Sequence, residues 1–255
     1  MVRHFKYCLK QTLKPKHIFV CFLGLPKEKS FMIQAFKELF GNLDNVYIVE
    51  SNFNFKYIGR YQIALGAPDD YVVMLDDDRF PMPNYCKRMI EVISKEECLV
   101  QQSGWILNTS NNNIHSFGYS ADKIRYTVKG VADMGGTFLD ASESINKTDR
   151  DRLFNADYLC GGIVFRRDSL KYLFSQPFPT RTGEDIAFCL RAKQNNIPVY
   201  ILLPDINKEE DSWLHDSNGV NFTANDIDTL IYRTKLIRSE LNLPFSDDDV
   251  NISEQ

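Results

Sequence analysis

The sequence lacks several features that define specialised classes of protein. The apolar run at residues 18–25 has eight residues, far fewer than the roughly 20 that a membrane-spanning helix needs. The N-terminus carries scattered lysines without a continuous apolar core or a small-residue cleavage site, so we expect no secretion signal. Neither G-x-G-x-x-G nor G-x-x-x-x-G-K-S/T occurs. Their absence disfavours dinucleotide binding and P-loop chemistry, because each depends on a glycine-rich phosphate loop.

Cysteine spacing and net charge exclude further classes. The six cysteines form no C-x-x-C pair and several lie in apolar segments, which indicates reduced thiols in a cytoplasmic protein rather than a disulfide framework or a zinc site. The net charge of −4 equals the charge of the last ten residues, so the rest of the chain is formally neutral. A neutral chain without a basic stripe argues against nucleic acid as a partner.

Hydrophobic periodicity predicts an α/β fold. Within the first 80 residues we expect strands at 17–25, 45–50 and 71–75 and helices at 30–40 and 58–65. This alternation favours a mixed, mainly parallel sheet flanked by helices. Residues 103–150 give no clear pattern. The remaining expected elements are helices at 85–94, 184–194 and 224–241 and strands at 98–102, 156–165 and 199–203.

Residues 71–85 carry the strongest functional signal. An apolar run at 71–75 predicts a central strand buried on both faces, and Asp76, Asp77 and Asp78 follow it directly. At an effective dielectric constant of roughly 20, two carboxylates about 5 Å apart repel by about 3 kcal/mol, so a positive group should lie among them. Mg²⁺ suits such oxygen ligands, and ligands of open α/β sheets bind beyond the carboxyl ends of strands. The alternative is a simple turn before a helix that begins near Asn84.

Three later features are ambiguous when each is taken alone. Gly161 and Gly162 interrupt an expected strand, which indicates either a close approach of a ligand to the backbone or a bulge. Glu184 and Asp185 open a helix, where carboxylates also simply complement the helix dipole. His215 is a single histidine in Trp213-Leu214-His215-Asp216, and such a residue is more often structural than a metal ligand.

In this order, over roughly residues 17–217, the features resemble the GT-A-fold, family-two-like glycosyltransferases, which use nucleotide-sugar donors. The resemblance implies that Asp78 binds Mn²⁺ or Mg²⁺, that Asp76 binds the metal or the ribose, and that Asp77 is the variable middle residue of an Asp-x-Asp motif. It implies that Asp185, beside Glu184, is the catalytic base and that His215 is a further metal or diphosphate ligand. It places donor contacts at Phe22, Leu23, Glu50, Asn52 and Arg60, and acceptor contacts at Gly161 and Gly162.

The resemblance also divides the chain. Residues 1–16 are expected to be an N-terminal extension and 17–245 a single GT-A catalytic domain, with a nucleotide-binding half at about 17–102 and an acceptor-binding half at about 103–245. Residues 246–255 form an acidic tail that we expect to be disordered. The final helix carries an apolar face that would pack on the sheet or on a second copy in a homodimer: Ile227, Leu230, Ile231 and Leu241.

The expected function is a metal-dependent, inverting transfer of a hexose or N-acetylhexosamine from a UDP-sugar to a hydroxyl group on a glycan, a protein or a lipid-linked acceptor. A divalent cation offsets charge on the departing diphosphate. The acceptor hydroxyl needs a base, and the helix dipole is expected to lower the pKa of Asp185 and keep it ionised. Two alternatives remain: a sugar-nucleotide nucleotidyltransferase, and a non-catalytic glycan-binding domain on the same fold.

Overall fold

The computed structural model describes residues 2–77, 79–108, 115–120, 123–128, 153–177, 182–202, 213–215 and 227–242. The side chain of Asp78, that of His215 and the acidic tail lie outside the described residues, as do the side chains of Ile227, Leu230 and Ile231. No described helix is both long and apolar enough to cross a bilayer. All six cysteines are free thiols.

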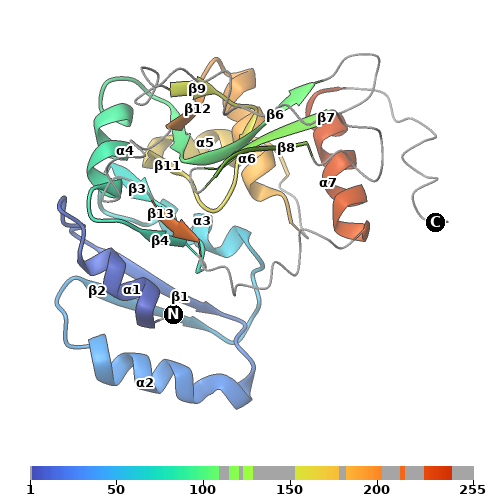
Figure 1. The fold of residues 1–255 in the computed structure, drawn as a ribbon. Helices are drawn as coiled ribbons and strands as arrows, with labels where there is room; N and C mark the ends of the chain where they lie inside the picture. The colour runs from blue at the N-terminus through green and yellow to red at the C-terminus, as the bar shows by residue number, and fades with distance from the viewer. Residues whose placement is uncertain are drawn as a thin grey trace.

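The N-terminal elements form a small unit at one end of the molecule (Figure 1). Strands β1 (Ile18–Leu23) and β2 (Val46–Ser51) pair in parallel, connected by the 3₁₀ turn η1 (Lys27–Lys29) and helix α2 (Ser30–Phe40). Helix α1 (Val2–Leu9) places Phe5 against the α2 aromatics, in a cluster with Phe22 and Val46. The predicted strands and the predicted helix at 30–40 are confirmed, whereas α1 was not expected.

A five-stranded sheet forms the centre of the fold, in the order β3 (Tyr71–Val73), β11 (Val164–Arg166), β5 (Leu99–Gln101), β12 (Val199–Leu202) and β9 (Leu153–Asn155). The α/β class is confirmed. Parallel pairing, however, is limited to β1 with β2 and β5 with β12 among the described strands. The reason is that β11 lies between β3 and β5 and runs against both, and β9 likewise runs against β12.

Helices cover both faces of this sheet. Alternate residues of one strand point to opposite sides, so Phe165 of β11 lies in one core cluster and Val164 in the other. The Phe165 side is covered by α3 (Ile58–Leu65), α5 (Leu170–Leu173) and α6 (Glu184–Gln194), and η4 (Arg167–Ser169) links β11 to α5. The Val164 side is covered by α4 (Tyr85–Ile93). The predicted bounds of α3 and α6 are confirmed.

Strand β3 differs from the expected buried central strand. It is three residues long, stands at the end of the sheet order, and leaves 38% of Tyr71 exposed. Regular pairing with β11 stops after Val73, and the chain continues beside it through single hydrogen bonds, from Met74 N–H to the Ile163 carbonyl at 3.0 Å and from Asp76 N–H to the Gly161 carbonyl at 3.4 Å. The apolar run therefore leads into the acidic loop without remaining a strand.

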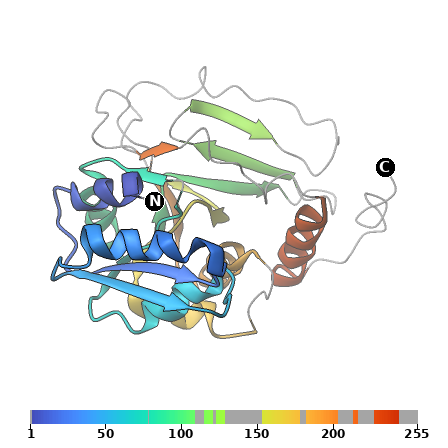
Figure 2. The same cartoon turned by 90° about the horizontal axis from the view of Figure 1, so that it is seen from below.

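The described strands between residues 103 and 128, together with one strand from further along the chain, form a second, antiparallel sheet that periodicity did not predict. Its order is β10 (Tyr158–Leu159), β6 (Ser103–Asn108), β7 (His115–Ser120) and β8 (Lys123–Val128). Figure 2 shows β6, β7 and β8 side by side along one side of the molecule. A further pair joins β4 (Arg79–Pro81) to β13 (Trp213–His215), antiparallel, directly after the acidic loop.

The segment expected to be an N-terminal extension contacts the chain directly after the acidic loop. The Gln11 side chain, 1% exposed, donates to the carbonyls of Pro81 and Met82 at 2.8 and 2.9 Å and accepts the Cys86 N–H at 2.9 Å. Thr12 N–H donates to the Pro83 carbonyl at 2.7 Å. Since a buried amide that makes three such bonds fixes the backbone around it, the start of the chain belongs to the structure that carries the aspartates.

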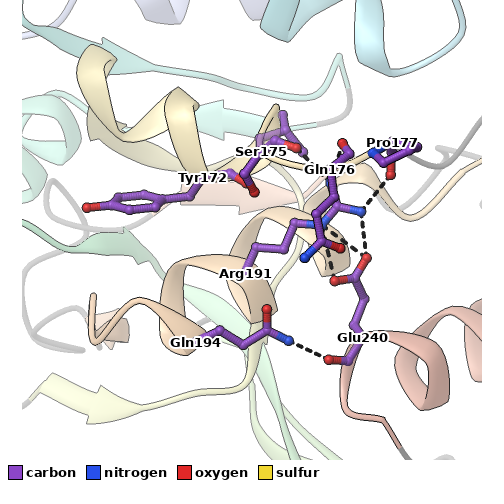
Figure 3. A network of polar contacts seen from close by, with 8 residues as sticks. Tyr172, Ser175, Gln176, Pro177, Arg191, Gln194 and Glu240 are labelled. Carbon is purple, nitrogen blue, oxygen red and sulfur yellow. Dashed lines mark hydrogen bonds and ion pairs between the residues drawn. The ribbon is translucent and has the colours of Figure 1, made fainter.

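Helix α7 (Ile227–Glu240) is attached to α6 by a buried ion pair (Figure 3). The Arg191 guanidinium contacts Glu240 at 2.6 Å and donates to the carbonyls of Leu173, Gln176 and Pro177 at 2.7, 3.1 and 2.7 Å. Both side chains are less than one-tenth exposed. The pair therefore ties α7, the end of α5 and α6 to one another.

Replacing Arg191 with Met should lower the free energy of unfolding by about 3–5 kcal/mol, because Glu240 would keep a buried charge without a partner. Lys193→Met is the matched control on the same helix. Lys193 forms an ion pair with Asp157, and both side chains are more exposed than those of Arg191 and Glu240. Its replacement should therefore lower the free energy of unfolding by about 1 kcal/mol or less. Urea unfolding measures the free energy of unfolding of both variants. Equal losses would contradict the stabilising role given to the buried Arg191–Glu240 pair.

Candidate functional site

Arg60 joins two of the predicted acidic sites. Its guanidinium forms an ion pair with Asp76 through Nη1 and another with Glu184 through Nη2, the second at 2.9 Å. Asp76 lies 16 residues from Arg60 in sequence and Glu184 lies 124 residues from it. The end of β3 and the start of α6 are therefore on the same side of the sheet and share one cation. This arrangement also meets the expectation that a positive group lies beside the aspartates.

The two glycines lie against the backbone of the acidic loop. Gly161 and Gly162 have φ of +79° and +117°, and a Cβ added to Gly162 would lie 2.2 Å from the Met74 carbonyl oxygen. The Gly161 carbonyl accepts the Asp76 N–H. Gly162 therefore allows the close approach of the chain's own backbone at Met74 and Leu75, and the acceptor contact of the two glycines stays a prediction.

The strand pair β4 and β13 brings the backbone of His215 to the same region. His215 is the register partner of Arg79, the residue that follows Asp78. Two features separated by more than 130 residues in the chain are therefore adjacent in space. The side chains of His215 and Asp78 lie outside the described residues, so their roles as metal ligands stay predictions.

Burial governs the protonation of the acids at the start of α6. Burial raises the pKa of Glu184 to about 7, the neighbouring Asp185 charge adds to the rise, and Arg60 opposes it. Burial also raises the pKa of Asp185, against the opposing effects of Arg233, Arg60 and the Ile186 N–H, which donates to the carboxylate at 2.9 Å. The expectation that the helix dipole lowers the pKa of Asp185 is therefore wrong, because desolvation outweighs the dipole.

The five expected donor contacts other than the aspartates are distributed over different environments. Arg60 is at the centre of the site. Leu23 packs against α3, where its side chain occupies the space that a Cβ at Gly59 would need. Phe22 is 3% exposed, and its ring centroid lies 5.8 Å from that of Phe36, so its side chain is buried in the core and not available to a ligand.

The remaining two, Glu50 and Asn52, lie toward α2 and the following loop. Glu50 forms an ion pair with Lys37. Together with residues of α2, Glu50 lines a hollow of about 360 Å³. Neither Arg60 nor its partners Asp76 and Glu184 line this hollow. Asn52 is exposed in the loop after β2. The structure therefore does not bring these two side chains to Arg60, and their contact with a donor stays a prediction.

Sequence reasoning missed two residues beside this site. Tyr61 is fully buried next to Arg60, which lies over its ring at 5.4 Å. Burial raises the pKa of Tyr61 well above its usual range. Arg233 of α7 acts electrostatically on Asp185. The helical pattern of 58–65 could have placed Tyr61, but no local signal distinguishes Arg233 from the other basic residues of the final helix.

The donor set fits a hard divalent cation. Among the described residues no group of three His, Cys, Asp or Glu side chains is arranged to hold a metal. Asp76 is half-buried and Asp77 is exposed. Mg²⁺ is commonly held by only one or two carboxylates, with water and substrate phosphates completing its shell. Asp76 and Asp77 are therefore sufficient in kind, and Asp78 would add a third oxygen ligand.

Comparison with known proteins identifies the fold. No family model matches the sequence, and no curated protein matches it. Among solved structures the chain is similar to GalNAc-T7, in a crystal structure with UDP, GalNAc and Mn²⁺, with a TM-score of 0.57 at 11% identity. The match covers 92% of this chain and 45% of that one, so this chain spans less than half the length of GalNAc-T7. The GT-A fold is thereby confirmed, and family-two-like kinship stays a prediction.

Stability should fall as the pH rises through the range in which Glu184 titrates. Between about pH 4.5 and 7 the Glu184 carboxyl group is ionised in the unfolded chain but still protonated in the folded protein. Raising the pH over this range therefore stabilises the unfolded state relative to the folded state. We expect the free energy of unfolding to drop by about 2 kcal/mol between roughly pH 5 and 7.5, at ~1.4 kcal/mol per pKa unit. Glu184→Gln should reduce this dependence of the free energy of unfolding on pH. Glu91→Gln, at an exposed position on α4, should leave it unchanged. If urea unfolding gave the same pH dependence for both variants, Glu184 would not be the group that titrates in this range.

Gly162→Ala tests the backbone contact with Met74. The substituted residue would combine a disfavoured φ with a clash against a carbonyl oxygen, so we expect a loss of about 3 kcal/mol of stability. Gly66→Ala is the control, because its φ of −85° suits any residue and its Cβ has room. Thermal and urea unfolding measure the difference, and a neutral Gly162→Ala would contradict the described geometry.

Proposed function

We propose that this chain is a metal-dependent, inverting glycosyltransferase that moves a hexose or N-acetylhexosamine from a UDP-sugar to an acceptor hydroxyl group. The observation that carries the proposal is the shared contact of Arg60 with Asp76 and Glu184. It joins the acidic loop, suited to a metal and a diphosphate, to the helix start that bears a second pair of acids. The likeness to a protein crystallised with UDP, GalNAc and Mn²⁺ supports the donor and metal classes.

The acidic loop would hold the cation. Asp76 and Asp77, with Asp78, supply carboxylate oxygens, and the proposal places His215 next to them through β13. When bound, Mn²⁺ or Mg²⁺ supplies Lewis-acid stabilisation of negative charge on the leaving diphosphate. Gln11 and the β4–β13 pair fix the backbone that directly follows this loop.

Arg60 would serve the diphosphate. Its guanidinium is multiply hydrogen-bonded, yet its Nε is buried and has no hydrogen-bond partner among the described residues. Arginine binds phosphate oxygens through its planar array of N–H donors. With a metal ion at the acidic loop, Arg60 would offer part of its N–H array to the diphosphate, while Glu184 would continue to hold the guanidinium.

Asp185 would act as the base. Asp185 as a residue is half-buried, whereas Glu184 beside it is 4% exposed and engaged with Arg60. The raised pKa of Asp185 brings its basicity closer to neutral pH, where a general base is most effective. One acid thus anchors Arg60 and its neighbour remains available to take the proton from an acceptor hydroxyl group.

The proposal is tested by incubating the protein with Mn²⁺ and a panel of nucleotide sugars and acceptors. Release of UDP that stops when a chelator removes the metal supports the transferase. Pyrophosphate release would instead indicate a nucleotidyltransferase, and glycan binding without turnover a non-catalytic domain. NMR of the anomeric proton in the product decides whether the configuration is inverted.

Asp185→Asn should lower the transfer rate by about 10²-fold or more, the usual effect of removing a positioned base. Binding of UDP with Mn²⁺, measured by calorimetry, should change little because Asp185 does not contact the acidic loop in the described structure. Asp168→Asn is the control, since that side chain is 84% exposed on η4. An undiminished rate in Asp185→Asn would assign the base to another group.

A further inference from the structure

The hollow between α2 and Glu50 is separate from the proposed transfer site. Val46 and Ile48 of β2 pack in the cluster that includes the α2 aromatics, and Glu50, two residues further on, points to the same side of the strand pair. Leu23 of β1 contacts Gly59 of α3. Figure 1 shows α2 and α3 on opposite sides of the β1–β2 pair. Because α3 carries the guanidinium of the transfer site, a ligand in the hollow would be a different ligand.

One flank of α2 and the end of β2 line this hollow. Helix α2 places Phe36 and Phe40 in the core. Positions 30, 34 and 37 form the neighbouring stripe, because residues three and four apart share a helix face. The volume of about 360 Å³ lies at the lower end of the range of ligand pockets, roughly 300–1,000 Å³. The lining residues are Ser30, Phe31, Ile33, Gln34, Lys37 and Glu50.

The charges of the lining residues balance each other. Lys37 of α2 and Glu50 of β2 form an ion pair, and their side chains are 44% and 41% exposed. An ammonium group has three N–H donors and a carboxylate has two oxygens, so each group can also bind a ligand while the pair persists. The lining offers no second cation to a phosphate or a nucleotide. This balance favours an uncharged polar ligand.

An exposed aromatic ring forms part of the lining, and two more follow Glu50 in the chain. Phe31 is 68% exposed, and Phe53 and Phe55 are 67% and 39% exposed with ring centroids 4.9 Å apart. The Ser51 hydroxyl accepts the Phe53 N–H at 3.0 Å, which orders the start of this loop. A single exposed apolar side chain needs no explanation, but several that are close in the chain to one hollow indicate an interaction surface.

We propose that the hollow between α2 and Glu50 is a second ligand site, which binds a neutral oligosaccharide. A sugar ring presents a face of C–H groups and an edge of hydroxyl groups. Phe31 offers a flat apolar surface for the C–H face. Donors and acceptors for the hydroxyl groups come from Ser30, Gln34 and the Lys37–Glu50 pair. The inference rests on the proposed function only for the role of the bound glycan, which is to hold an acceptor on the enzyme outside the transfer site.

The test is glycan binding with divalent metal removed by a chelator, so that a metal-dependent site does not contribute. The protein is applied to an array of neutral oligosaccharides, and those retained are titrated by NMR. The ring signals of Phe31 and the side-chain amide signals of Gln34, assigned with Phe31→Ser and Gln34→Ala, should shift. Phe31→Ser should weaken binding by about tenfold, the usual effect of removing an anchor residue. Leu39→Ser removes a 61% exposed side chain of the same helix outside the hollow and should leave binding unchanged.

Two results would overturn the inference: retention of no neutral glycan, and equal affinities of Phe31→Ser and Leu39→Ser for the retained ones. Shifts of the Phe31 and Gln34 signals with UDP or inorganic phosphate instead of a glycan would also overturn it, because the hollow would then be an anion site. Calorimetry should give the same affinity of Phe31→Ser and the unchanged protein for UDP with Mn²⁺, and a parallel loss would contradict the separation of the two sites. The glycan titration requires no turnover. Glycan binding in the hollow without transfer from any donor would therefore count against the proposed function alone.

Discussion

One guanidinium between two carboxylates is the contact on which the site depends. Arg60 is held by Asp76 from the end of β3 and by Glu184 from the start of α6. These three side chains are partly or fully removed from water, and each depends on the others for charge compensation. Removing one of them would leave an uncompensated charge in a medium of low dielectric constant. Counted with Asp77, the site holds three carboxyl groups and one guanidinium, a balance that suits the divalent cation proposed above.

The rest of the fold fixes the two ends of this bridge. The acidic loop is held by Gly161, and the chain directly after it is held by Gln11 from the N-terminal segment. Helix α6 is buried along most of its length, and the Arg191 network attaches it to α5 and α7 (Figure 3). A site whose parts come from rigid elements keeps its geometry before a ligand arrives, and this preorganisation reduces the free-energy cost of binding.

Local pattern was enough to predict α2, α3, α4, α6 and α7 and the identity of the acidic stretches, but not α1 or α5. The bounds of α2, α3 and α6 follow from apolar periodicity and from glycines at their ends, which act within a few residues. The order of strands depends on contacts between distant segments. For this reason β3 was expected at the centre of a mainly parallel sheet, although β11 returns beside it in the opposite direction. The meeting of Arg60 with Glu184 and the burial that raises the pKa of Asp185 are likewise consequences of packing, and no spacing in the sequence encodes them.

The central claim is that the acidic loop and the start of α6 form one nucleotide site around Arg60. A crystal structure of the protein with UDP and Mn²⁺, using the anomalous signal to locate the metal, tests it most directly. The account predicts a manganese ion bound to a carboxylate of the Asp76–Asp78 stretch, with diphosphate oxygens in contact with Arg60. Manganese and nucleotide bound elsewhere, for instance in the hollow between α2 and Glu50, would contradict it.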